Sequence, residues 1–335
     1  MEDKMKKILA ILIVMTLALS ACAPKANQKE SLKSDPVDVR VVALKGPTGM
    51  GLAKFMDEEP DETYNNFSFE LVGAVDEIPP KIIQGNVDIA AVPANLASIL
   101  YNNTQGEVQV LAVNTLGVLY IVENGSSVKS LQDLKGKTLY ASGKGATPEY
   151  ALNHLLKQAG VDPEKDITIE WKSEHAEVVA AMTAEQNAIG LLPQPFVTVA
   201  QAKNENIKMA VDLNTQWEEL NKNSDSPLLI TGAFVVRREF AEANPQAVKE
   251  FMDHYHASQK FVNENLEEAS LLMEKFDIIK APIAQKAIPY CYIVDINGVE
   301  MKKIMGGYLK ILKEANPKSI GGNLPGEDFY YGQEK

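Results

Sequence analysis

The chain of 335 residues has only two cysteines, Cys22 and Cys291. Two cysteines are too few for a thiolate zinc site or an iron–sulfur cluster. The histidines are equally sparse, and His254 and His256 stand two apart, which places them on different faces of a helix. We therefore expect neither a metal site nor a cofactor, and we expect Cys291 to be a small core residue.

Arginine and positive charge are also scarce. The formal net charge is −12, and there are only three arginines, Arg40, Arg237 and Arg238. No basic run follows the first few residues, which argues against binding to nucleic acid. A phosphate or carboxylate clamp built from arginine side chains is also disfavoured.

The common catalytic and nucleotide-binding motifs are missing. Residues 41–55 read VVALKGPTGMGLAKF, a strand pattern that enters a Gly-rich turn. A Walker loop would need Lys and Ser or Thr after its second glycine, but Leu52 and Ala53 stand there. The spacing of Gly46, Gly49 and Gly51 does not match a dinucleotide fingerprint either. With no HExxH motif or local Ser/His/Asp pattern, we expect a protein that is not an enzyme.

The N-terminus carries an export pattern. Three lysines precede an apolar run at 8–19 that is too short to span a membrane, and Leu-Ser-Ala-Cys follows directly. This predicts a signal peptide at 1–21 and lipidation of Cys22, with the polar stretch 22–37 as a disordered tether. The protein would then be extracytoplasmic and anchored to the cell membrane. The alternative is an ordinary secreted protein in which Cys22 has no such role.

From residue 38 onward, short β-rich runs alternate with helical patterns, and this alternation occurs twice, over 38–120 and 118–232. Such alternation predicts an α/β fold with a mostly parallel sheet in each of two lobes. Helices are predicted over 48–59 and from Thr147, as N-cap, to Gly160; after residue 236 the chain is mostly helical. We expect lobe 1 to comprise 38–116 and 236–335, and lobe 2 to comprise 117–235. The chain would cross between them near 114–119 and 231–236, with a ligand cleft in between.

Several segments resemble the solute-binding proteins of bacterial ABC importers, in the group that includes nitrate, sulfonate, taurine and thiamine-precursor binders. The segments are KGPTGMG at 45–51, GNVDIAAVPAN at 85–95, SVKSLQDLKGKTLYASGKGATPEY at 127–150, LLPQPFVTVAQA at 191–202 and FVVRREFAEANPQAVKEFM at 234–252. The resemblance implies a type II periplasmic-binding-protein fold, two hinge crossings, and delivery of a small anionic or polar molecule to a permease with its ATPase. We expect a monomer.

The ligand of these relatives does not transfer to this chain. Many relatives have an acidic residue where this chain has Gln194, and their arginine contacts have few counterparts here. The ligand therefore stays open between a small anion and a neutral heterocycle.

The candidate ligand-binding residues lie where strands end and helices begin. Each has a structural alternative: a turn that needs glycine, a helix cap, or packing in the core. The candidates are Thr48, Gly49, Met50, Asn95, Asn114, Thr115, Ser142, Gly145, Ala146, Thr147, Gln194 and Phe196.

Two functions fit this sequence. One is a membrane-anchored solute-binding protein of an importer. The other is an extracellular sensor, or an enzyme that reuses the same fold. Adjacent genes for a permease and an ATPase would favour the first.

Overall fold

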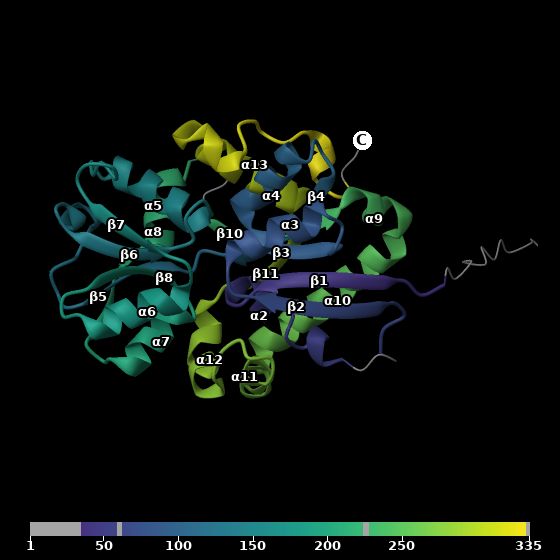
Figure 1. Ribbon diagram of the computed structural model, residues 1–335, viewed down its shortest axis with the longest axis horizontal. Helices are drawn as coiled ribbons and strands as arrows, with labels where there is room; N and C mark the ends of the chain where they lie inside the picture. The colour runs from purple at the N-terminus through teal and green to yellow at the C-terminus, as the bar shows by residue number, and fades with distance from the viewer. Residues whose placement is uncertain (1–34, 59–61, 224–227, 333–335) are drawn as a thin grey trace, which may run out of the picture. The chain divides into compact units, whose positions relative to one another are not determined.

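Two β-sheets form the framework of the protein (Figure 1). The computed structural model describes residues 35–58, 62–223 and 228–332, so the predicted signal at 1–21, Cys22 and most of the tether lie outside the described residues. The first sheet has the order β11-β4-β10-β3-β1-β2. Its strands are β1 (Asp38–Leu44), β2 (Asn66–Val72), β3 (Ile89–Pro93), β4 (Val108–Leu116), β10 (Ile230–Arg237) and β11 (Ile293–Asn297).

The second sheet has five strands in the order β7-β6-β8-β5-β9. They are β5 (Leu119–Asn124), β6 (Thr138–Ser142), β7 (Thr168–Lys172), β8 (Ile189–Pro193) and β9 (Ile207–Asp212). The central strand β8 is buried along its whole length, as expected for a strand covered by helices on both faces.

The two sheets repeat one strand order, β2-β1-β3-β10-β4 in the first and β7-β6-β8-β5-β9 in the second. In this shared set, only β10 and β5 run antiparallel to their neighbours. Each of them is the first strand after the chain passes from one sheet to the other. The predicted α/β class, with two mostly parallel sheets flanked by helices, is confirmed.

The position of β10 differs from the expected partition of the chain. Residues 230–235 were assigned to lobe 2, yet Ala233 is paired with Val92 of β3 and Val113 of β4 in the first sheet. β10 is apolar and buried over nearly all its length, so it belongs in the centre of that sheet. The chain therefore leaves the second sheet before Ile230. The lobes as units that move relative to each other remain a prediction.

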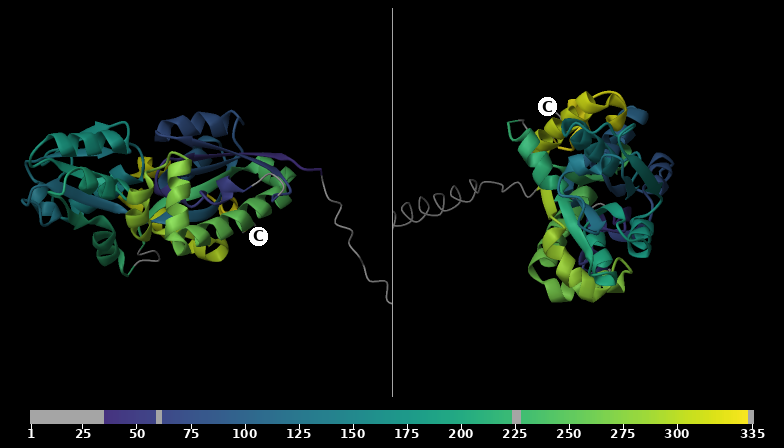
Figure 2. Two further views of the ribbon diagram at one scale, coloured as in Figure 1. Left: turned by 90° about the horizontal axis from the view of Figure 1, so that it is seen from below. Right: turned by 90° about the vertical axis from the view of Figure 1, so that its left-hand side faces the viewer.

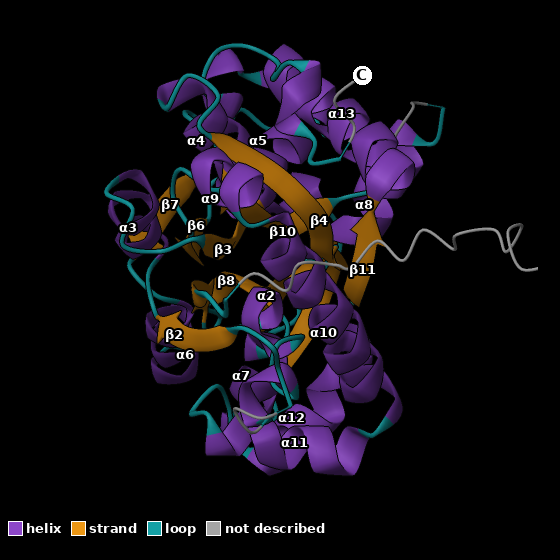
Figure 3. Ribbon diagram, turned by 90° about the vertical axis from the view of Figure 1, so that its right-hand side faces the viewer, coloured by secondary structure: helices purple, strands orange, loops and turns teal. Residues whose placement is uncertain are grey.

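Helices cover both sheets. Helix α13 contacts β4 of the first sheet and α5 beside the second (Figures 1 and 2), while α10 packs beside β11 (Figure 3). No helix among the described residues combines the length and apolar composition that a membrane crossing requires. The helices are α2 (Pro47–Met50), α3 (Ile78–Ile83), α4 (Ala94–Asn103), α5 (Thr147–Gln158), α6 (His175–Ala184), α7 (Phe196–Lys203), α8 (Leu213–Asn221), α9 (Arg238–Ala243), α10 (Pro245–Glu264), α11 (Leu266–Lys275), α12 (Ala281–Ala287) and α13 (Gly298–Ala315).

The helix predicted over 48–59 is wrong as a regular element. The structure has the four-residue helix α2, a series of turns, and a 3₁₀ turn at Phe55–Asp57. Glycine is the reason, because it weakens a helix and because the turn lies directly on the end of β1. A Cβ on Gly49 would lie 2.5 Å from the carbonyl oxygen of Leu44, so only glycine fits there.

Two further local predictions need correction. Ala146, in an extended conformation, is the N-cap of α5, and Thr147 is the first helical residue, so the predicted Thr147 cap is wrong. β11, in a region predicted to be mostly helical, is an edge strand that pairs only with β4. Cys291, just before it, is buried, as expected.

Candidate functional site

A small cavity of about 70 Å³ lies where the two sheets face each other. Pro93, Gly143 and Pro193 reach it from the ends of β3, β6 and β8, the carboxyl ends of parallel strands. This edge is the usual ligand position in open α/β sheets. The lining residues are Leu44, Lys45, Pro47, Thr48, Val75, Pro93, Val118, Leu119, Gly143, Ala146, Pro148, His175, Pro193 and Thr231.

The first passage between the sheets forms part of the cavity wall. Gly117 and Val118 connect β4 to β5, and both have positive φ, a backbone conformation that a β-branched residue such as Val118 seldom adopts. The Gly117 N–H donates to the Leu229 carbonyl (2.7 Å), just before β10. The two passages between the sheets are therefore hydrogen-bonded to each other beside the cavity.

His175 supplies a polar group to this largely apolar cavity and is paired with Ser142, which does not itself line the cavity. Ser142 is the last residue of β6 and His175 is the first residue of α6. Ser142 Oγ lies 2.6 Å from His175 Nδ1. Burial lowers the pKa of His175 to about 4, so its imidazole is neutral at physiological pH. The pair therefore offers hydrogen bonds without a positive charge. Sequence reasoning found Ser142 but missed His175, whose only signal was its place at the start of a helix.

The N-terminus of α5 faces the same cavity through Ala146 and Pro148. Its first amides are not free for a ligand there, because the Ala146 N–H donates to the Gly143 carbonyl (3.1 Å), Pro148 has no N–H, and Thr147 does not line the cavity. Gly145 is occupied differently, because its N–H donates to Glu149 Oε2 (2.6 Å) and its carbonyl accepts from Asn95 Nδ2 (3.3 Å). The candidate Ala146 thus lines the cavity, while Gly145 lies in the adjoining turn.

Three candidates, Thr48, Asn114 and Thr115, are linked by hydrogen bonds at the end of β4 in the first sheet. Asn114 Nδ2 donates to the Thr48 carbonyl (3.3 Å), and the Thr115 hydroxyl donates to Asn114 Oδ1 (3.1 Å). Gly232 of β10 leaves room for this group, since a Cβ there would lie 2.4 Å from Asn114 Oδ1 and 2.5 Å from Thr48 Cγ2. Of the three, Thr48 lines the cavity. Sequence reasoning gave no sign of Gly232.

Asn95 of α4, a helix that packs on the first sheet, is hydrogen-bonded to Thr147 at the start of α5. The Thr147 hydroxyl donates to Asn95 Oδ1 (3.3 Å), and Asn95 Nδ2 donates to the Ser319 carbonyl (2.9 Å). Both side chains are fully buried. Their observed partners are protein groups, and neither residue is among those that line the cavity.

None of the remaining candidates is among the residues that line the cavity. The Phe196 ring stands 4.9 Å from that of His175, and it would lie 3.8 Å from a Cβ on Gly46. Gln194 Oε1 accepts from the backbone and hydroxyl of Thr198 (3.3 and 2.9 Å). Gly49 packs on β1, as described above. Met50 is fully buried in an apolar cluster with residues of α10, α11 and α12, and it does not line the cavity.

The charged side chains near the site have partners within the protein. Lys45, the one charged residue that lines the cavity, forms an ion pair with Asp277 (2.8 Å). Arg40 and Arg237 both bind Asp88 (2.7 and 3.1 Å), and Arg238 binds Asp328 (2.8 Å). None of the three arginines lines the cavity.

Two similar sheets, joined by passages beside a cavity at their strand ends, give the protein a two-lobed α/β architecture. Residues 53–285 match the family model described as ABC transporter, phosphonate, periplasmic substrate-binding protein. The chain belongs to this family, which confirms the resemblance to ABC importer solute-binding proteins. No relative of curated function matches the chain.

Solved structures share the fold. An ABC transporter protein from Parabacteroides distasonis is 22% identical with a TM-score of 0.73, over 90% of this chain and 100% of that one. The alkanesulfonate-binding protein SsuA from Xanthomonas axonopodis pv. citri, bound to MOPS, is 15% identical with a TM-score of 0.69, over 88% and 96%. The nitrate-binding protein NrtA from Synechocystis PCC 6803 is 15% identical with a TM-score of 0.59, over 75% and 69%.

Proposed function

We propose that this protein captures a small alkyl phosphonate or sulfonate in the cavity between its sheets and delivers it to the permease of an ABC importer. In this proposal the protein is an extracytoplasmic monomer, anchored to the membrane through lipidated Cys22, and it catalyses no reaction. The family match and the ligands named for related structures support the class of molecule.

The observation that carries the proposal is the Ser142–His175 pair beside the N-terminus of α5. A tetrahedral oxyanion needs several donors around one point, and the His175 imidazole and the Thr48 hydroxyl, which both line the cavity, are candidates for that role. The cavity of about 70 Å³ is small, which favours a compact ligand. Its apolar lining would strengthen each hydrogen bond to the oxyanion.

Calorimetric titration with methylphosphonate, methanesulfonate and nitrate tests this function. We expect measurable binding of at least one of them, and a loss of about tenfold or more in affinity for His175→Ala, equivalent to about 1.4 kcal/mol. His256→Ala is the matched control, because that imidazole is 67% exposed and paired with Asp295. If the protein is folded and none of the three anions binds, the oxyanion proposal is wrong.

The two predicted lobes, with β10 counted in the first because it pairs there, bear on delivery. A ligand that binds between two lobes shifts them toward a closed state through its differential affinity for the two states. X-ray scattering should then give a smaller radius of gyration on saturation. An unchanged radius, with an open form still present, would contradict the hinge. Turnover of the ligand, or binding to a receptor kinase, would indicate the alternative enzyme or sensor.

A further inference from the structure

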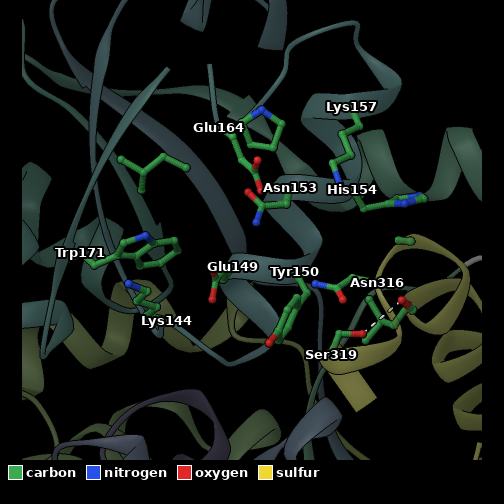
Figure 4. A pocket seen from close by; sticks show the side chains of 14 residues that line it. Lys144, Glu149, Tyr150, Asn153, His154, Lys157, Glu164, Trp171, Asn316 and Ser319 are labelled. Carbon is green, nitrogen blue, oxygen red and sulfur yellow. Dashed lines mark hydrogen bonds between the residues drawn. The ribbon is translucent and has the colours of Figure 1, made fainter. Parts of the chain in front are cut away.

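A second cavity, of about 380 Å³, borders helix α5. Figure 4 shows Tyr150 of α5 between Trp171 of β7 on one side and Asn316, just after α13, on the other. Its two lysines are exposed: Lys144 precedes α5 and Lys157 lies in the last turn, roughly 20 Å apart along the helix axis. These charged groups do not converge on one point, so this cavity gives no basis for a ligand site.

In the cavity between the sheets, the hydroxyl of Ser142 bonds to one nitrogen of the His175 ring. Ser142 Oγ lies 2.6 Å from His175 Nδ1, and Ser142 is only 2% exposed. Among the described residues, Nδ1 is the one hydrogen-bond partner of this hydroxyl. Either the hydroxyl donates to a bare Nδ1, or Nδ1–H donates to the hydroxyl oxygen. The two arrangements place the hydrogen of a neutral imidazole on different nitrogens.

The burial of the hydroxyl favours the first arrangement. If Nδ1–H were the donor, the hydroxyl hydrogen would have no acceptor among the described residues, and a buried donor without a partner is destabilising. If the hydroxyl donates, its hydrogen is paired, and only spare lone pairs of the same oxygen are left without a partner. Nδ1 is therefore the acceptor of this bond and carries no hydrogen.

The single hydrogen of the neutral His175 ring then belongs to Nε2. Burial lowers the pKa of His175 to about 4, so the ring is neutral at physiological pH. No described residue bonds to Nε2, and this nitrogen is not among the buried polar atoms that are closed to water. His175 lines the cavity, whereas Ser142 does not. Nε2–H is therefore a hydrogen-bond donor left for a ligand, and Ser142 acts on that ligand only through His175.

We propose that Ser142 is a positioning residue: it fixes the tautomer of His175, and the site thereby selects ligands that present a hydrogen-bond acceptor to Nε2. This inference deepens the proposed function and rests on it, because a deprotonated phosphonate or sulfonate oxygen is such an acceptor. The Thr48 hydroxyl, which also lines the cavity, is a second donor. A ligand N–H or O–H at the same place would face Nε2–H as donor against donor, and the site would reject it.

Nitrogen-15 NMR of the ligand-free protein tests the tautomer directly. The chain has only four histidines, and His175→Gln identifies the His175 signals by their loss. At pH 7 we expect the shift of a hydrogen-bearing nitrogen at Nε2 and that of a bare nitrogen at Nδ1. In Ser142→Ala both signals should move toward averaged shifts, and Ser142→Thr, which keeps the hydroxyl, should restore the parental pattern. A hydrogen-bearing Nδ1 in the parent protein would overturn the proposal.

Calorimetry tests the effect on binding, with whichever of methanesulfonate, methylphosphonate and nitrate binds most tightly. A ring without the Ser142 bond has two tautomers and two flipped orientations, so about one quarter of the molecules would present the donor and the affinity should fall about fourfold in Ser142→Ala. Ser142→Thr should keep the parental affinity. Ser98→Ala is the matched control, because it removes another buried serine hydroxyl, bonded to the Ile320 carbonyl (2.8 Å) and not part of the cavity lining. Thermal unfolding checks that each variant is folded.

Unchanged affinity in folded Ser142→Ala, or an equal loss in Ser98→Ala, would overturn the positioning role. The NMR measurement needs no ligand, so it separates this proposal from the proposed function. If none of the three anions binds while the spectrum shows Nε2–H, the proposed function is wrong and the tautomer assignment stands.

Discussion

Replacing Asn95 by alanine should destabilise the protein markedly, because this fully buried amide connects three segments. It donates to the carbonyls of Ser319 (2.9 Å) and Gly145 (3.3 Å) and accepts from the Thr147 hydroxyl (3.3 Å). An unsatisfied buried group costs about 1–3 kcal/mol, and two of the three bonds are long. We therefore expect a loss of about 2–4 kcal/mol in the free energy of unfolding.

Urea unfolding at pH 7 measures this loss through the midpoint and slope of the transition. Two control variants separate the effect of burial from the effect of the number of hydrogen bonds lost. Ser98→Ala, on the same helix, removes one buried bond to the Ile320 carbonyl (2.8 Å) and should cost about 1 kcal/mol. Asn86→Ala removes an exposed bond to Gln84 and should cost less than about 0.5 kcal/mol. An Asn95→Ala variant no less stable than Ser98→Ala would refute the reasoning.

Three further predictions concern the membrane anchor and pH. Cys22→Ala should leave the protein unprocessed or release it from membranes, as cell fractionation would show. The folded-state pKa of His175, about 4, lies below its unfolded value. The free energy of unfolding should therefore fall by up to about 1.4 kcal/mol per pH unit as the pH drops from 6.5 toward 4. In His175→Gln this fall should be smaller, and urea unfolding at several pH values measures it. Burial alone would raise the pKa of Asp88, but the hydrogen bonds from Arg40 and Arg237 hold this pKa below its usual value. Asp88→Asn should therefore be destabilising at pH 7, with a deficit that shrinks as acid protonates Asp88 in the parent protein.

Much of the fold could be predicted because its strands are distinctive in sequence. The β-rich run at 38–44 and the apolar run at 189–193, which belong to the alternation predicted over 38–120 and 118–232, form β1 and β8. β11 was missed because it is a five-residue edge strand. Its backbone is supported by side chains of α10: Gln259 donates to the Ile293 carbonyl (2.8 Å), and the Tyr255 hydroxyl donates to that of Val294 (2.7 Å). Neither contact leaves a local signal.

The candidate site stays a prediction. Of the candidates that the sequence placed at the turns where strands end and helices begin, Thr48 and Ala146 line the cavity between the sheets. The roles of individual side chains were less predictable. Met50 fitted a cleft position by sequence, yet it lies in the core. His175 was missed because its partner Ser142 is 33 residues away and on a different strand.

The sequence by itself determined the α/β class, the two similar modules and the turns at which a ligand site was expected, since hydrophobic periodicity and glycine placement are local properties. Only the tertiary structure decided which polar groups meet. Asn95 faces Thr147 rather than the cavity between the sheets, and Lys144 and Lys157 border a second cavity whose far wall includes Asn316. Such pairings depend on how segments that are far apart in the chain pack against each other, and local sequence patterns do not give the distances between those segments.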